Sequence, residues 1–117
     1  MANKVLSARL PQVLADAARA HARRRQGATV SNLLDILLKS AIEEHCVVPA
    51  LPDSPEVRDT KLDLRLPPAT LESLQCECQR IRTRPSVYVR VLLHNYYVTQ
   101  RLQIVEEGGR YKLAVCP

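Results

Sequence analysis

The sequence predicts a mainly α-helical protein with a short two-stranded antiparallel ribbon, built from two strand-helix-helix copies in one chain, plus a C-terminal β-hairpin. Three observations predict this fold. The ending Arg-Leu-Pro occurs twice, at residues 9–11 and 65–67, each time after a short strand-like segment. Two segments with helical apolar spacing follow each ending. A proline-rich stretch separates the two copies.

The first copy, residues 1–45, begins with an expected strand over residues 5–10 that a proline ends. A helix is expected over about residues 12–25, with Gly27 as the residue that breaks it. Thr29 then suits the N-cap of a second helix. The apolar residues of this second helix fall at i, i+1, i+4, i+5, i+8 and i+9, which is one helix face: Leu33, Leu34, Leu37, Leu38, Ala41 and Ile42.

Residues 46–59 are expected to form an extended linker. Its prolines remove backbone donors and disfavour helix at the residues before them. About 13 extended residues span up to ~40 Å, enough to cross a small domain. The linker is also acidic, with one arginine against three Asp and Glu residues, and it lies between two basic copies.

The second copy, residues 60–98, repeats the plan of the first with an expected strand over residues 61–66. The strands superpose at an offset of 56 residues and the second helices at an offset of 55, which indicates an internal repeat. Pro85 suits the first turn of the last helix. The expected apolar faces are Leu71, Leu74, Cys78 and Ile81 in the first helix, and Tyr88, Val89, Leu92, Leu93, Tyr96 and Tyr97 in the second.

The last segment, residues 99–117, belongs to neither copy. The sequences "LQIVE" and "RYKLAV" flank "EGG", which is a hairpin signal. This hairpin is expected either to cover the helical core or to contact a protein partner.

One short strand beside two helices cannot form a sheet alone, so the two strands are expected to pair antiparallel above four helices. This arrangement resembles the ribbon-helix-helix (Arc/MetJ-type) superfamily of DNA-binding proteins. The resemblance rests on "VLSARLP" with "GATVSNLLDILL" and on "KLDLRLP" with "RTRPSVYVRVLL", and covers about 80 of 117 residues. Family members usually form this unit from two chains, so a tandem chain would be a pseudo-dimer. The second copy has Arg82 where the first has the breaker Gly27.

Alternation along a strand directs every second side chain outward. The resemblance implies that the ribbon enters the DNA major groove and that the outward residues contact base edges. Arg9 and Arg65 are suited to guanine, while Asp63 would accept from cytosine or instead pair with a cation of the ribbon. The predicted base-reading residues are Val5, Ser7, Arg9, Lys61, Asp63 and Arg65.

The start of each second helix offers unpaired N–H groups and a positive dipole end to phosphate. The predicted phosphate contacts are Thr29, Val30 and Ser31 in the first copy, and Arg84 and Ser86 in the second. The run "RAHARRRQ" adds positive charge, either as a solvated helix face or as a nonspecific phosphate contact.

The net charge of +5 and the pI of about 9.3 favour a polyanionic partner. No zinc spacing, phosphate loop or catalytic constellation can be assembled, so no enzyme, metal or cofactor is expected. Cys78 is expected in the core and Cys76 partly exposed. The absence of a signal peptide or a long apolar run favours a cytoplasmic location, without contact with a membrane.

Three functions remain open. The first is a sequence-specific regulator of transcription that binds double-stranded DNA. The second, which the resemblance admits, is a DNA-binding accessory factor at a plasmid transfer origin in conjugation. The third is an antitoxin-like module that binds a protein through its tail. Self-association on DNA is compatible with the first two.

Overall fold

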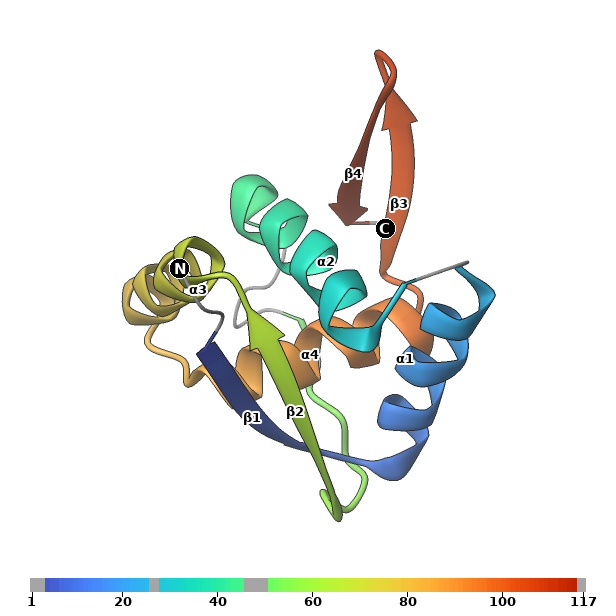
Figure 1. The fold of residues 1–117 in the computed structure, drawn as a ribbon, viewed down its shortest axis with the longest axis vertical. Coiled ribbons are helices and arrows are strands. Elements are labelled where there is room, and N and C mark those ends of the chain that lie inside the picture. The colour runs from blue at the N-terminus through green and yellow to red at the C-terminus, as the bar shows by residue number, and fades with distance from the viewer. Residues whose placement is uncertain (1–3, 26–27, 46–50, 116–117) are drawn as a thin grey trace.

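The computed structural model describes residues 4–25, 28–45 and 51–115, apart from the side chains of residues 107, 110 and 111. Within this part the chain forms four helices and two antiparallel two-stranded sheets (Figure 1). Gly27 and the start of the linker, residues 46–50, lie outside the described residues. The elements are β1 (Lys4–Leu10), α1 (Gln12–Arg24), α2 (Val30–Glu44), β2 (Thr60–Leu66), α3 (Pro68–Ile81), α4 (Pro85–Tyr97), β3 (Leu102–Glu107) and β4 (Arg110–Val115).

The strands β1 and β2 pair antiparallel within the chain, with Ser7 opposite Asp63 at the centre of the register. Figure 1 shows the two strands side by side on one side of the helices. Their inward side chains meet the core as the alternation predicts, because a mostly polar outward row and an apolar inward row occupy opposite faces. Leu6 is half-buried, and the buried residues of the inward row are Ala8, Leu10, Leu62, Leu64 and Leu66.

Each second helix packs against the strand of the other half of the chain. Helix α4 lies on β1, and helix α2 lies on β2. The predicted apolar face of α2 is buried, with Ile42 half-buried at its end. On α4 the predicted face is buried up to Leu93, while Tyr96 and Tyr97 are half-buried. The two halves therefore share one aliphatic core.

The helix boundaries follow the predicted signals closely. The Thr29 Oγ1 accepts a 3.1 Å hydrogen bond from the Asn32 N–H and caps α2. Pro68 and Pro85 occupy the first positions of α3 and α4, where a missing N–H costs no helical hydrogen bond. In α3, Leu74 and Cys78 are buried, whereas Leu71 and Ile81 are half-buried.

Helix α3 ends on Arg82, which has a left-handed backbone at φ 56°. The N–H of Thr83 donates a 2.9 Å hydrogen bond to the Cys78 carbonyl and closes the turn. This geometry normally favours glycine, because a side chain in the left-handed region is strained. The second copy thus achieves its helix break with a strained arginine.

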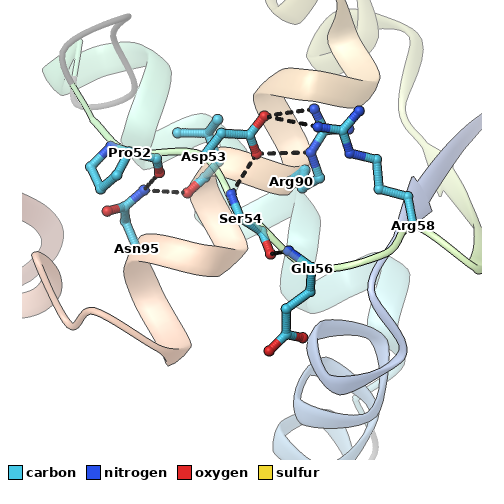
Figure 2. Close-up of polar contacts among 8 residues, drawn as sticks. Pro52, Asp53, Ser54, Glu56, Arg58, Arg90 and Asn95 are labelled. Carbon is cyan, nitrogen blue, oxygen red and sulfur yellow. Dashed lines mark hydrogen bonds and ion pairs between the residues drawn. The ribbon is translucent and has the colours of Figure 1, made fainter.

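The described part of the linker is attached to α4 rather than simply extended (Figure 2). Arg90 donates from Nε to Asp53 Oδ1 at 2.8 Å and from Nη2 to Asp53 Oδ2 at 2.7 Å. The Asn95 amide donates to the Pro52 carbonyl at 2.8 Å. The linker therefore covers the polar side of α4, which explains why Tyr88–Asn95 is buried on all sides.

The predicted C-terminal hairpin is present as β3 and β4. Gly108 and Gly109 join the strands with φ values of 61° and 79°. Positive φ at both central residues is the requirement of a type I′ turn, which only residues such as glycine meet at low cost. Leu102 and Leu113 are buried at its base. Figure 1 shows the hairpin tip projecting beyond the helices. No helix of the described chain is long and apolar enough to span a bilayer.

Candidate nucleic-acid interface

The outward face of the ribbon is solvent-exposed at every predicted base-reading position. The strand register arranges these six side chains in three cross-strand rows. They are Val5 with Arg65, Ser7 with Asp63, and Arg9 with Lys61. The face therefore carries three cations around one carboxylate. Alternation predicts which residues face outward, and the strand register adds how they pair across the ribbon.

The central row is joined by a hydrogen bond. The Ser7 hydroxyl donates to Asp63 Oδ1 at 2.6 Å, and Lys61 Nζ lies 3.9 Å from the same oxygen. Asp63 thus lies within ion-pair distance of Lys61, which was one of the two roles expected for it, and its contact with cytosine stays a prediction. Within the described residues, neither the Arg9 nor the Arg65 guanidinium has an ion-pair partner, so both are available to a ligand.

The two arginines lie at opposite ends of this face. Arg9 and the residue opposite Arg65 are four positions apart on β1. At about 3.4 Å per residue, their rows are separated by ~14 Å. That length corresponds to about four base pairs along DNA, at ~3.4 Å per step. The spacing suits two separate base contacts with the central row between them.

The N-terminus of α2 is connected directly to the ribbon. The Ser31 Oγ accepts a 2.9 Å hydrogen bond from the Arg65 N–H. Thr29 is exposed beside it, and Val30 and Ser31 are half-buried. Because the Ser31 oxygen is bonded to β2, its hydroxyl hydrogen and the free N–H groups of the first turn remain for an anion. This connection fixes the position of the helix end relative to the Arg65 side chain.

The N-terminus of α4 differs from that of α2. Arg84 occupies the N-cap position without a side-chain capping bond and is exposed. Its carbonyl accepts from the Tyr88 N–H at 2.9 Å. Ser86 is half-buried. A guanidinium therefore stands where the first copy has the capping hydroxyl of Thr29, so the two predicted phosphate contacts are chemically unlike.

The arginine run at the end of α1 is mostly solvated. Arg19 lies 3.8 Å from Asp16 in an exposed pair, and Arg23, Arg24 and Arg25 are exposed. An exposed pair of this kind contributes little stability. The run therefore forms a largely solvated helix face, and its nonspecific phosphate contact stays a prediction.

Sequence reasoning missed the residues that hold the linker. The Arg90 side chain is only 6% exposed, and a charged group buried to this extent is costly unless it is paired. The Arg90 hydrogen bond, ahead of the charge of Arg58, holds the pKa of the Asp53 carboxyl below its ordinary value. The available signal was an arginine in the middle of an apolar helix, which requires a buried acceptor from elsewhere.

No group of metal-binding side chains occurs in the described residues. Cys76 is exposed and Cys78 is buried, as predicted. Burial raises the pKa of the Cys78 thiol to about 11, so this thiol is protonated at neutral pH. Cys46 and Cys116 lie outside the described residues. Comparison of the chain with protein-family models, curated proteins and solved structures finds no match.

Proposed function

We propose that this protein is a sequence-specific double-stranded DNA-binding protein of the ribbon-helix-helix type, in tandem single-chain form, that regulates transcription. The observation that carries the proposal is the outward face of the ribbon, where Arg9 and Arg65 are exposed and free of ion pairs within the described chain. A two-stranded ribbon fits the major groove, and arginine is the commonest specific partner of guanine.

The helix ends support the same binding mode. Ser31 joins the start of α2 to β2, and α4 packs against β1. The start of α2 is therefore held at the ribbon, and α4 lies against it. The N–H groups at the starts of these two helices would meet the phosphates on either side of the groove. The net charge of +5 adds long-range attraction to DNA.

The two strands would read unlike bases. Val5, Ser7 and Arg9 on β1 correspond to Lys61, Asp63 and Arg65 on β2. A dimer of identical chains suits a palindrome, whereas one chain with two unlike strands suits a site without dyad symmetry.

A DNA-binding accessory factor at a plasmid transfer origin is the second candidate, and the same asymmetry favours it, because an asymmetric site gives DNA a direction. The two candidates share the protein-DNA contacts and differ in where the site lies. The antitoxin-like module has less support, because the tail folds as a hairpin with Leu102 and Leu113 buried rather than extending as a free segment.

Selection of bound duplexes from a random pool tests the proposal. Enrichment of one motif without internal dyad symmetry is expected. Recovery of unenriched DNA would contradict sequence-specific binding, and a perfectly symmetric motif within one chain's footprint would contradict unlike reading by the two strands. A genomic footprint then separates the candidates: a promoter supports the regulator, and a site beside a nicking locus supports the accessory factor.

A further inference from the structure

A cavity of about 440 Å³ lies where the C-terminal ends of α1 and α4 meet the start of β3. Its apolar wall includes Leu102 and Ile104, and its aromatic wall is formed by His21, Tyr96 and Tyr97. Figure 1 shows these three elements converging at the base of the hairpin, away from the exposed face of the ribbon. This cavity is broadly open to solvent, and its lining is polar and apolar in nearly equal measure. Clefts of this size in which aromatic side chains lie beside a few placed polar groups are typical of small-molecule sites.

The three rings are held in one fixed arrangement. His21 stacks on Tyr96 at 6.0 Å between centroids and 5° between planes, and Tyr97 meets both rings edge-on. The His21 Nδ1 and the Tyr97 hydroxyl share a 2.8 Å hydrogen bond. The chain has no Phe or Trp and only four tyrosines, so this is a concentration of rings in an otherwise aliphatic protein. Aromatic rings prefer offset-stacked and edge-to-face contacts, so a planar aromatic ligand would pack against this cluster in one of these geometries.

The cavity is also electropositive. Arg24 lines it, while none of its lining residues is a carboxylate. Burial, followed by the charges of Arg24 and Arg25, lowers the pKa of His21. Gln100 and Gln103 also line the cavity, and the Gln103 side-chain amide donates to the Gln100 backbone carbonyl at 3.4 Å. Guanidinium and amide donors together suit a carboxylate.

We propose that this cavity binds a small planar aromatic carboxylate, of about the size of an indole ring system, with the ring against Tyr96 and the carboxylate at Arg24. Such a ligand would touch α1 from the first half of the chain and α4 and β3 from the second. This site is separate from the DNA-binding proposal and does not depend on it.

Nuclear magnetic resonance titration of the full chain tests the proposal with three probes. Indole-3-carboxylate carries both features, indole-3-carboxamide lacks the charge, and cyclohexanecarboxylate lacks the aromatic ring. Indole-3-carboxylate is expected to give saturable amide shifts confined to the cavity and to bind at least ~10-fold more tightly than either of the other two probes. If no saturable shifts appear up to about 5 mM of probe, the proposal is overturned, because a specific site would bind more tightly than that. Equal affinity for the carboxamide, or shifts centred on the ribbon, would also overturn it.

Two arginines adjacent in α1 provide a matched pair of variants. Arg24 lines the cavity and Arg23 does not, although both are exposed and carry the same charge. Arg24→Gln is expected to lose about tenfold in affinity for indole-3-carboxylate, whereas Arg23→Gln keeps the wild-type affinity. Equal losses in both variants would mean diffuse charge attraction and no site. Retention of wild-type amide dispersion shows that each variant is folded.

Discussion

The Ser7 hydroxyl donates a 2.6 Å hydrogen bond to Asp63 Oδ1 across the centre of the ribbon. This bond positions the one carboxylate of an otherwise cationic face between the rows that hold Arg9 and Arg65. A carboxylate at the centre of a DNA-binding face repels phosphates, so it reduces affinity for DNA in general. It can still favour a site that offers it a base amino group.

Asp63→Asn should therefore bind random-sequence DNA more tightly, by up to ~10-fold at low salt, with a smaller gain at high salt because screening shortens the reach of the charge. Its preference for the selected site should fall. Fluorescence anisotropy with both duplexes at two salt concentrations measures this. Asp16→Asn, an exposed carboxylate change on α1, is the control and should leave the preference unchanged. An equal effect of both variants would show that only net charge matters.

The bond between Asp53 and Arg90 should stabilise the fold. Asp53→Ala leaves the buried Arg90 guanidinium without its carboxylate, and removal of one partner from a buried pair is costly. Because the Asp53 side chain is 35% exposed, we expect a loss of about 2 kcal/mol in the free energy of unfolding, less than for a fully buried pair. Urea denaturation measures it.

Asp59→Ala is the matched control for that loss, since it removes an exposed carboxylate from the same linker. It should change the free energy of unfolding by less than ~0.5 kcal/mol. If Asp53→Ala is equally mild, the linker does not depend on Arg90 for its attachment to α4.

The lowered pKa of Glu77 predicts how the stability of the fold depends on pH. Arg80 donates from Nε to Glu77 Oε1 at 2.7 Å and from Nη2 to Oε2 at 2.9 Å, and His45 Nδ1 lies 3.0 Å from Oε2. The Arg80 hydrogen bonds first, and then that of His45, lower the pKa of the Glu77 carboxyl from 4.5 to about 2, against the opposing effect of burial. Folding therefore favours the ionised form of this side chain.

Between pH 4.5 and about 2 the unfolded chain binds a proton at Glu77 that the folded chain does not. Stability contributed by this group is thus present above pH 4.5 and is lost as the pH falls through this window. Urea midpoints of wild type and Glu77→Gln, measured across the window, should show a shallower pH dependence in the variant. Glu72→Gln, an exposed change on the same helix, should keep the wild-type slope. Three identical slopes would contradict the assignment.

Arg82 offers a stabilising substitution. Its φ of 56° lies in the region where side chains are strained, so Arg82→Gly should raise the free energy of unfolding by about 1 kcal/mol. Thermal and urea unfolding measure the gain. Arg101→Gly removes the same charge from an exposed position with no positive φ and should give no gain. A loss of stability in Arg82→Gly would mean that the arginine side chain makes a contribution larger than the strain.

Local patterns predicted those parts of the fold that depend on neighbouring residues. Alternation predicted that Leu64 lies on the inward side of the ribbon and Arg65 on the outward side, because the period of a strand is two. The turn of β3 and β4 followed from two adjacent glycines. Pro85 and Thr29 marked helix starts for the same local reason.

Contacts between distant residues could not be predicted in this way. Asp53 and Arg90 are 37 positions apart, and Ser31 and the Arg65 N–H are 34 apart. Each bond depends on how the halves pack, which no local period encodes. The ring cluster of His21 with Tyr97 joins residues 76 positions apart and was missed because Tyr97 belongs to an apolar stripe typical of core.

The outward face of the ribbon is proposed to read base sequence. The most direct test is the affinity of wild type, Arg9→Ala and Arg65→Ala for the selected duplex and for a scrambled duplex at one salt concentration, with Arg101→Ala as the exposed control. Each ribbon variant should lose ~1–3 kcal/mol on the selected duplex and much less on the scrambled one. Equal losses on the two duplexes would contradict the claim, because they would show that these arginines hold only phosphates.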